Sequence, residues 1–131
     1  MAKVKQITAW TESLPGQIGR IAKALGEAKI NITAFTAYGT GGESPIRMQV
    51  NSPAKAKKIL LDLGYRVTEE DVIRLTIPDK PGALGEIGDR LGKAHVNVDY
   101  SYASVGKGAK KVDLVLGISD LAGAAKALRG L

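Results

Sequence analysis

The residues best suited to chemistry are two Pro-Gly pairs, Pro15-Gly16 and Pro81-Gly82, each followed by an amphipathic segment. Proline is tolerated in the first turn of a helix because its missing N–H would have had no partner there. The glycine leaves the free N–H groups of that turn unshielded. Those donors, together with the positive end of the helix dipole, suit a carboxylate. The sequence therefore predicts an anion-binding helix start at each pair.

The two pairs belong to a repeat. Residues 15–32 read PGQIGRIAKALGEAKINI and residues 81–98 read PGALGEIGDRLGKAHVNV, at a constant offset of 66. Eight of the 18 positions are identical, against roughly one expected from average composition. Two copies are too few for a solenoid, so we expect two packed modules. We place them at residues 1–68 and 69–131.

Hydrophobic spacing predicts the elements of each module. Ile18, Ile21 and Leu25 recur at helical intervals, and Ser52-Pro53 is a helix start in which the serine hydroxyl should cap. The first module is expected to have strands at 4–9, 30–38, 46–50 and 65–67, helices at 15–29 and 53–63, and a hairpin loop at 39–42. The second is expected to have strands at 72–77, from 96 and at 112–118, helices from 81 and 119, and a hairpin around 106–108.

This order predicts an α+β fold made of two ferredoxin-like βαββαβ modules in tandem, the second without a clear last strand. A missing strand leaves a sheet edge open, and open edges need cover. The apolar strand at 112–118 is the edge that we expect to need it. The sister module or another subunit should complete the sheet, and we expect two chains to form a homodimer.

Composition excludes several classes of protein. The chain has no cysteine, hence no disulfide framework and no thiolate metal site. No apolar run approaches the roughly 18 residues that span a bilayer, and the first ten residues lack the apolar block of a secretory signal. We therefore expect a cytoplasmic protein without membrane association. The net charge of +6 fits an anionic partner, but solubility alone explains it.

The second copy resembles the signature of ACT domains through Asp79-x-Pro81-Gly82-x-Leu84, then Ile87, Leu91 and Val96-Asn97-Val98. The first copy is similar, except that Ser13 replaces the acid. ACT domains are small ligand-sensing modules found in aspartokinase, the acetolactate synthase regulatory subunit and phosphoglycerate dehydrogenase. The resemblance covers nearly the whole chain, as two such units with no catalytic domain attached.

The resemblance implies that an amino acid's α-carboxylate docks on the backbone amides after Pro-Gly, while its ammonium meets Asp79 or an Asn side-chain oxygen. Ser13 carries no charge, so we expect unequal sites. A valine at Gly82 should block the carboxylate and change stability by less than about 1 kcal/mol. The expected ligand-binding residues are Ser13, Leu14, Pro15, Gly16, Gln17, Ile18, Asn31, Ile32, Asp79, Lys80, Pro81, Gly82, Ala83, Leu84, Asn97 and Val98.

Asn31 and Asn97 have two open interpretations. Asparagine is disfavoured in strands, so each could reach across a module interface to a ligand. Each could equally be a turn residue whose side chain bonds nearby backbone. Their recurrence at the same offset does not decide between the roles, because common ancestry would preserve either one.

Other functions are disfavoured. A βαββα order with basic charge also fits RNA recognition, but the strands at 46–50 and 112–118 lack the aromatic residues that such a sheet carries. His95 is the only histidine, and the chain has no catalytic triad, metal-ligand spacing or phosphate-loop motif. We expect no enzyme and no cofactor. The expected function is to bind a small molecule, an amino acid by this reading, and to act through ligand-dependent association. The alternatives are a regulatory subunit that docks on an amino-acid biosynthetic enzyme, a nucleic-acid-binding protein, and a structural dimer that has lost ligand binding.

Overall fold

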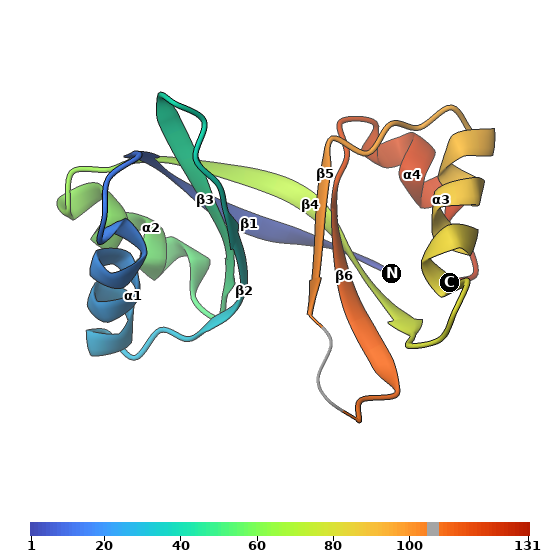
Figure 1. Cartoon of the computed structure of the whole chain (residues 1–131), viewed down its shortest axis with the longest axis horizontal. Helices are drawn as coiled ribbons and strands as arrows, with labels where there is room; N and C mark the ends of the chain where they lie inside the picture. The colour runs from blue at the N-terminus through green and yellow to red at the C-terminus, as the bar shows by residue number, and fades with distance from the viewer. Residues whose placement is uncertain (105–107) are drawn as a thin grey trace. The chain divides into compact units, whose positions relative to one another are not determined.

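The computed structural model describes residues 1–104 and 108–131, and Figure 1 shows the arrangement of their elements. Within those ranges the helices are 7 to 11 residues long, and none is long and apolar enough to cross a membrane. The elements in chain order are β1 (Ala2–Glu12), α1 (Gln17–Glu27), β2 (Ile32–Ala37), β3 (Glu43–Val50), α2 (Pro53–Asp62), β4 (Arg66–Pro78), α3 (Ala83–Lys93), β5 (Tyr100–Ser104), β6 (Lys111–Gly117) and α4 (Leu121–Ala127).

The chain divides into two compact units. The N-terminal unit comprises Lys5–Glu70, and the C-terminal unit comprises Asp71–Leu131 together with Met1–Val4. Strands β1 and β4 each contribute residues to both units.

In the N-terminal unit the strand order is β2-β3-β1-β4, and α1 and α2 cover one face of the sheet (Figure 1). Strand β3 pairs antiparallel with both neighbours, so that Met48 stands opposite Ile7 of β1 and Phe35 of β2. Helix α1 turns Ile21 and Leu25, four residues apart, toward the core. The core of this unit lies between that helical layer and the sheet.

In the C-terminal unit the strand order is β1-β4-β6-β5, where β1 is represented by its first residues. Helices α3 and α4 cover one face of this sheet (Figure 1), and Ile87 and Leu91 of α3 are buried against it. No strand follows α4 in the described part of the chain. Residues Met1–Val4 stand where the closing strand of a ferredoxin-like unit would be. The predicted fold of two ferredoxin-like modules, the second without its own last strand, is confirmed.

The expected exposed edge at 112–118 is wrong. Strand β6 pairs with β4 on one side and β5 on the other, with Leu114 opposite both Leu75 and Ala103. The strand is apolar because it is central in its sheet, and not because it awaits a partner.

Several element boundaries also differ from those predicted. The strands expected at 65–67 and 72–77 are parts of one strand, β4, and the strand expected from Val96 begins only at Tyr100. The hairpin expected around 106–108 falls largely outside the described residues. Ser52 does precede α2, but its side chain makes no capping hydrogen bond. Its ψ of 76° lies below the β region that a capping residue normally adopts.

The glycines of the two Pro-Gly pairs have a left-handed backbone. Gly16 has φ 91° and precedes α1, and Gly82 has φ 89° and precedes α3. A left-handed conformation costs a residue with a Cβ about 1–2 kcal/mol. The expectation that valine at Gly82 would leave stability almost unchanged is therefore wrong, because this residue is a turn residue before the helix rather than part of its first turn.

Two alanine substitutions separate this backbone effect from helix propensity. Gly82→Ala should lower the free energy of unfolding by about 1–2 kcal/mol. Gly88→Ala, in the middle of α3, should raise it by up to about 1 kcal/mol. An added Cβ meets nothing within 4 Å at either position, so steric clashes do not confuse the comparison. Urea denaturation of both variants measures the difference, and an unchanged stability for Gly82→Ala would contradict it.

Candidate ligand-binding sites

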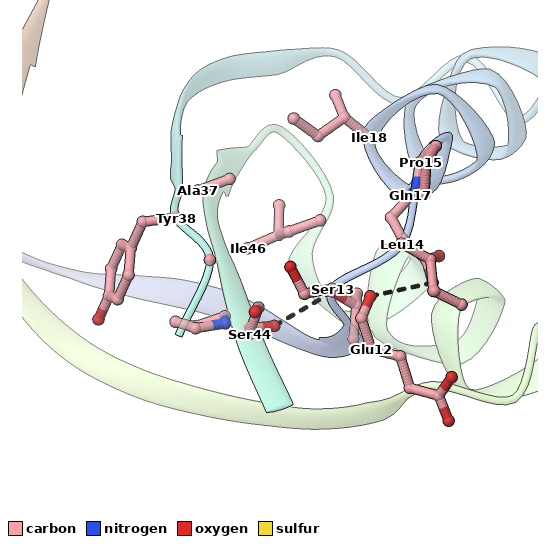
Figure 2. A pocket seen from close by; sticks show the side chains of 13 residues that line it. Glu12, Ser13, Leu14, Pro15, Gln17, Ile18, Ala37, Tyr38, Ser44 and Ile46 are labelled. Carbon is pink, nitrogen blue, oxygen red and sulfur yellow. Dashed lines mark hydrogen bonds between the residues drawn. The ribbon is translucent and has the colours of Figure 1, made fainter. Parts of the chain in front are cut away.

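A cavity of about 360 Å³ lies at the strand-to-helix turn of the N-terminal unit, and we call it the turn cavity (Figure 2). It is bounded by the end of β1, the turn itself, the start of α1, the end of β2 and the start of β3. Its lining residues are Thr11, Glu12, Ser13, Leu14, Pro15, Gln17, Ile18, Ala37, Tyr38, Gly39, Ser44, Pro45 and Ile46.

The strands hold the polar side of the turn cavity in place. The buried Thr11 hydroxyl donates to the carbonyl oxygen of Ser44 at 3.2 Å, which ties β1 to β3. The Ser44 hydroxyl accepts a hydrogen bond from the backbone N–H of Thr40 at 3.3 Å. Leu14 N–H donates to the Glu12 carbonyl at 2.8 Å and tightens the turn. The hydroxyls of Thr11 and Ser44 are thus held in place by hydrogen bonds to backbone groups.

Gln17 fixes the start of α1 beside the cavity. Its Nε2 donates to the Glu12 carbonyl at 3.3 Å, while its Oε1 accepts from the Tyr65 hydroxyl at 2.6 Å. Arg20 donates to the same Tyr65 hydroxyl at 3.2 Å and its guanidinium lies 5.0 Å from the centre of the tyrosine ring. The helix start therefore has little freedom, although no side chain caps it.

A second cavity, the apolar cavity, lies in the same unit. It measures about 230 Å³ and shares Ile18 and Ile46 with the turn cavity. Figure 2 shows the side chains of these two isoleucines pointing into the same space from α1 and β3. The lining residues of the apolar cavity are Ile18, Ile21, Ala22, Ile32, Phe35, Ile46 and Met48.

The C-terminal unit has a cavity of about 210 Å³ at its own strand-to-helix turn. Each of its lining residues stands 66 positions after a residue that lines one of the two N-terminal cavities. Asp79 thus takes the place of Ser13, and Lys80 takes the place of Leu14. The residues are Ile77, Pro78, Asp79, Lys80, Ala83, Leu84, Ala103, Val112 and Leu114.

The structure brings together some of the residues expected to bind a ligand and separates others. The turn cavity gathers Ser13, Leu14, Pro15, Gln17 and Ile18, and the C-terminal cavity gathers Asp79, Lys80, Ala83 and Leu84. Ile32 lines only the apolar cavity. Gly16, Pro81 and Gly82 lie in the same turns without lining these three cavities, and Asn31, Asn97 and Val98 line none of the three.

Sequence reasoning missed the part of each cavity that comes from the hairpin strands. Ala37 and Ile46 line the turn cavity, and Ala103 and Val112 line its C-terminal counterpart. The offset between these pairs is again 66, so extending the repeat past residue 32 would have found them.

The two asparagines make hydrogen bonds of different kinds. The backbone of Asn31 is paired with Asn51, whose Oδ1 accepts from the Asn31 N–H at 3.1 Å. The Asn97 Nδ2 donates to Asp99 Oδ1 at 3.1 Å, and the Ser119 hydroxyl donates to the other oxygen of Asp99 at 2.6 Å. These two donors, Ser119 first, lower the pKa of Asp99 below its ordinary value. The side chain of Asn97 thus makes a local contact, to a carboxylate rather than to backbone, whereas the contacts of Asn31 are made by its backbone. The role of the Asn31 side chain stays a prediction.

Removal of either donor should raise the pKa of Asp99, and Ser119→Ala should raise it more than Asn97→Ala. A folded-state pKa below the unfolded value stabilises the fold above that unfolded value, and the contribution disappears as the pH falls through the folded pKa. NMR titration of the Asp99 carboxyl carbon measures both shifts. A larger pKa change in Asn97→Ala would contradict this order and make Asn97 the main cause of the lowered pKa of Asp99.

Comparisons with solved structures agree with this fold. Protein BT0572 from Bacteroides thetaiotaomicron is 25% identical, with a TM-score of 0.88 over 96% of this chain and 86% of that one. The ligand-free regulatory subunit of aspartate kinase from Thermus thermophilus is 14% identical, with a TM-score of 0.70 over 94% and 88% of the two chains. Aspartate kinase from Clostridium acetobutylicum is also 14% identical, with a TM-score of 0.62 over 95% of this chain and 32% of that enzyme.

No curated protein matches the chain in sequence. The two aspartate kinase structures share the fold only, given their low identity. The family described as the ACT domain pair matches residues 2–124. That match covers both units and confirms the resemblance in the Pro-Gly motifs, so the chain belongs to the family of ACT domain pairs.

Proposed function

We propose that this ACT domain pair binds an amino acid at its strand-to-helix turns and responds through ligand-dependent association. An ACT domain pair is a regulatory module rather than a catalytic one. The observation that carries the proposal is the recurrence of a cavity at the same turn in both units, with lining residues at the same offset. A ligand site that was duplicated along with the sequence would have this arrangement.

The chemistry of the turn suits a zwitterion. Neither helix start has a side-chain cap, so the N–H groups of the first turn that make no backbone hydrogen bond remain as donors for a carboxylate. In α3 the N–H of the first residue, Ala83, is already used, because it donates to the Lys80 carbonyl at 3.3 Å. An ammonium group would find the hydroxyls of Ser13 and Ser44 in the N-terminal unit, and the carboxylate of Asp79 in the C-terminal unit. The two sites therefore differ in their acceptors and in the first N–H donor of the helix.

Ligand-dependent association follows from the thermodynamic linkage between ligand binding and assembly. A ligand that binds one assembly state better shifts the equilibrium toward that state, and a ligand at a hundred times its Kd stabilises the binding state by about 2.7 kcal/mol. We propose a homodimer as the state that responds. Docking on an amino-acid biosynthetic enzyme is the alternative form of the same function, since this fold occurs in the regulatory subunit of aspartate kinase. A cytoplasmic location stays a prediction.

A thermal-shift screen against the twenty amino acids and common nucleotides tests the proposal. At least one amino acid should raise the melting temperature, because ligand binding to the native state stabilises it. Light scattering with and without that amino acid should then show a change in mass.

If no amino acid shifts the melting curve, the proposed function fails. If the protein instead binds a polyanion with a steep loss of affinity in salt, nucleic acid replaces the amino acid as its partner.

Substitution of the two proposed ammonium acceptors, Asp79 and Ser13, should show which site contributes more to amino-acid affinity. Asp79→Ala is expected to weaken amino-acid binding by roughly five- to tenfold, since an ionised acceptor contributes more than a neutral one but solvent screens an exposed group. Ser13→Ala should have a smaller effect, because its hydroxyl carries no charge. Calorimetry of both variants measures the order, with Asp79→Asn as the isosteric control. The reverse order would make the N-terminal site the stronger one.

A further inference from the structure

The apolar cavity of the N-terminal unit has the character of a side-chain pocket. Every residue that lines it is apolar, and its volume of about 230 Å³ far exceeds the ~15 Å³ that a single water needs. Water entering it would find no side-chain hydrogen-bonding partner, so a hydrocarbon group is the favoured occupant.

Two walls of this cavity are formed by large apolar side chains that are about half exposed. Phe35 is 53% exposed and Ile18 is 49% exposed. At the base, Met48 is buried, and its flexible thioether adapts to groups of different shape. A ligand that filled the cavity would cover Phe35 and Ile18 and remove their apolar surface from water.

The apolar cavity adjoins the proposed site for the amino-acid head group. Both cavities are lined by Ile18 and Ile46, and the polar groups all lie on the turn side. A molecule held by its carboxylate at the turn would therefore extend its side chain past these isoleucines into the apolar cavity. This separation of polar from apolar lining matches an amino acid with a hydrocarbon side chain.

The C-terminal cavity repeats only part of the apolar lining, because Leu84, Val112 and Leu114 stand at the positions of Ile18, Ile46 and Met48. The residues equivalent to Ile32 and Phe35 are Val98 and Ser101, and neither lines the C-terminal cavity. Serine at the position of Phe35 removes one wall. The C-terminal cavity also has two charged residues, Asp79 and Lys80, at its turn. The apolar cavity of the N-terminal unit thus has an aromatic wall that the C-terminal cavity lacks, and this wall favours selection for a long apolar group in the N-terminal unit.

We infer that the ligand of the N-terminal unit has a branched aliphatic or aromatic side chain, which occupies the apolar cavity. This inference rests on the proposed function for the identity of the head group. Each buried methylene contributes about fourfold in affinity. Leucine, with three more carbons than alanine, should therefore bind the N-terminal unit roughly fiftyfold more tightly.

The test uses the only two methionines of the chain, Met1 and Met48. With ¹³C-methyl methionine, the NMR signal of Met48 reports on the apolar cavity and that of Met1 serves as the reference. The probes are leucine, phenylalanine, alanine, glycine and 4-methylpentanoate, which keeps the carboxylate and side chain of leucine without the ammonium. Met48→Leu assigns the signals.

The variants are Phe35→Ser, which installs the residue found at the equivalent C-terminal position, and Leu61→Ser as a matched control. Leu61 is a similarly exposed apolar residue, at 48%, on α2 and outside both N-terminal cavities. We expect leucine and phenylalanine to shift the Met48 signal. Phe35→Ser should weaken leucine binding about tenfold and leave alanine unchanged, and Leu61→Ser should behave as the unmodified protein.

The outcomes separate this inference from the proposed function. Amino acids that bind without preference for an apolar side chain, with the Met48 signal unmoved, would overturn the inference and leave the proposed function intact. If 4-methylpentanoate shifts Met48 in a Phe35-dependent way while every amino acid fails, the apolar pocket stands and the amino-acid function fails. If no probe shifts Met48 and none binds, both are wrong.

Discussion

The left-handed backbone of Gly16 and Gly82 is the constraint on which each unit depends. In both, four residues connect a strand to a helix: residues 13–16 between β1 and α1, and residues 79–82 between β4 and α3. A connection this short reaches the helix axis through one residue at positive φ, which glycine adopts without steric cost. The same missing Cβ leaves the first turn of the helix open. Under the proposed function, the structural and ligand-binding roles of these glycines would not be alternatives, because one backbone geometry serves both.

The helices and the duplicated turns could be predicted from the sequence because their signals are local. Apolar residues at helical spacing face the core, and the repeat locates both turns. Strand β4 could not be predicted as one strand, because Thr68–Asp71 is polar and resembles a linker. Its polar side chains pair with residues far away in sequence, as in the bond from Trp10 Nε1 to the Thr68 hydroxyl at 2.9 Å. The hydroxyl of Thr8 likewise donates to Glu70 at 2.8 Å.

The candidate sites were likewise predictable in part, at the turns but not at the opposite walls of the cavities. The turn residues carry a recognisable motif, so their place beside a cavity could be anticipated from the Pro-Gly pairs. The opposite walls come from β2, β3, β5 and β6, whose distance from the turn is set by packing and not by spacing along the chain. Phe35 is the clearest example, because its partner in the repeat is Ser101 and only the folded unit shows what that difference removes.

The two shared strands give this ACT pair a property that two separate modules would lack. Strand β1 begins at Ala2, within the C-terminal unit, and ends at the turn cavity of the N-terminal unit. Strand β4 begins in the N-terminal unit and ends at the turn that carries Asp79. Because residues of both strands belong to each unit, we expect the stabilities of the two units to be linked through these strands. Under the proposed function, a ligand that stabilises one turn also stabilises the strand leading into it, and thermodynamic linkage makes the effect reciprocal. Two sites with different acceptors and different side-chain pockets would then let one chain respond to two ligands together.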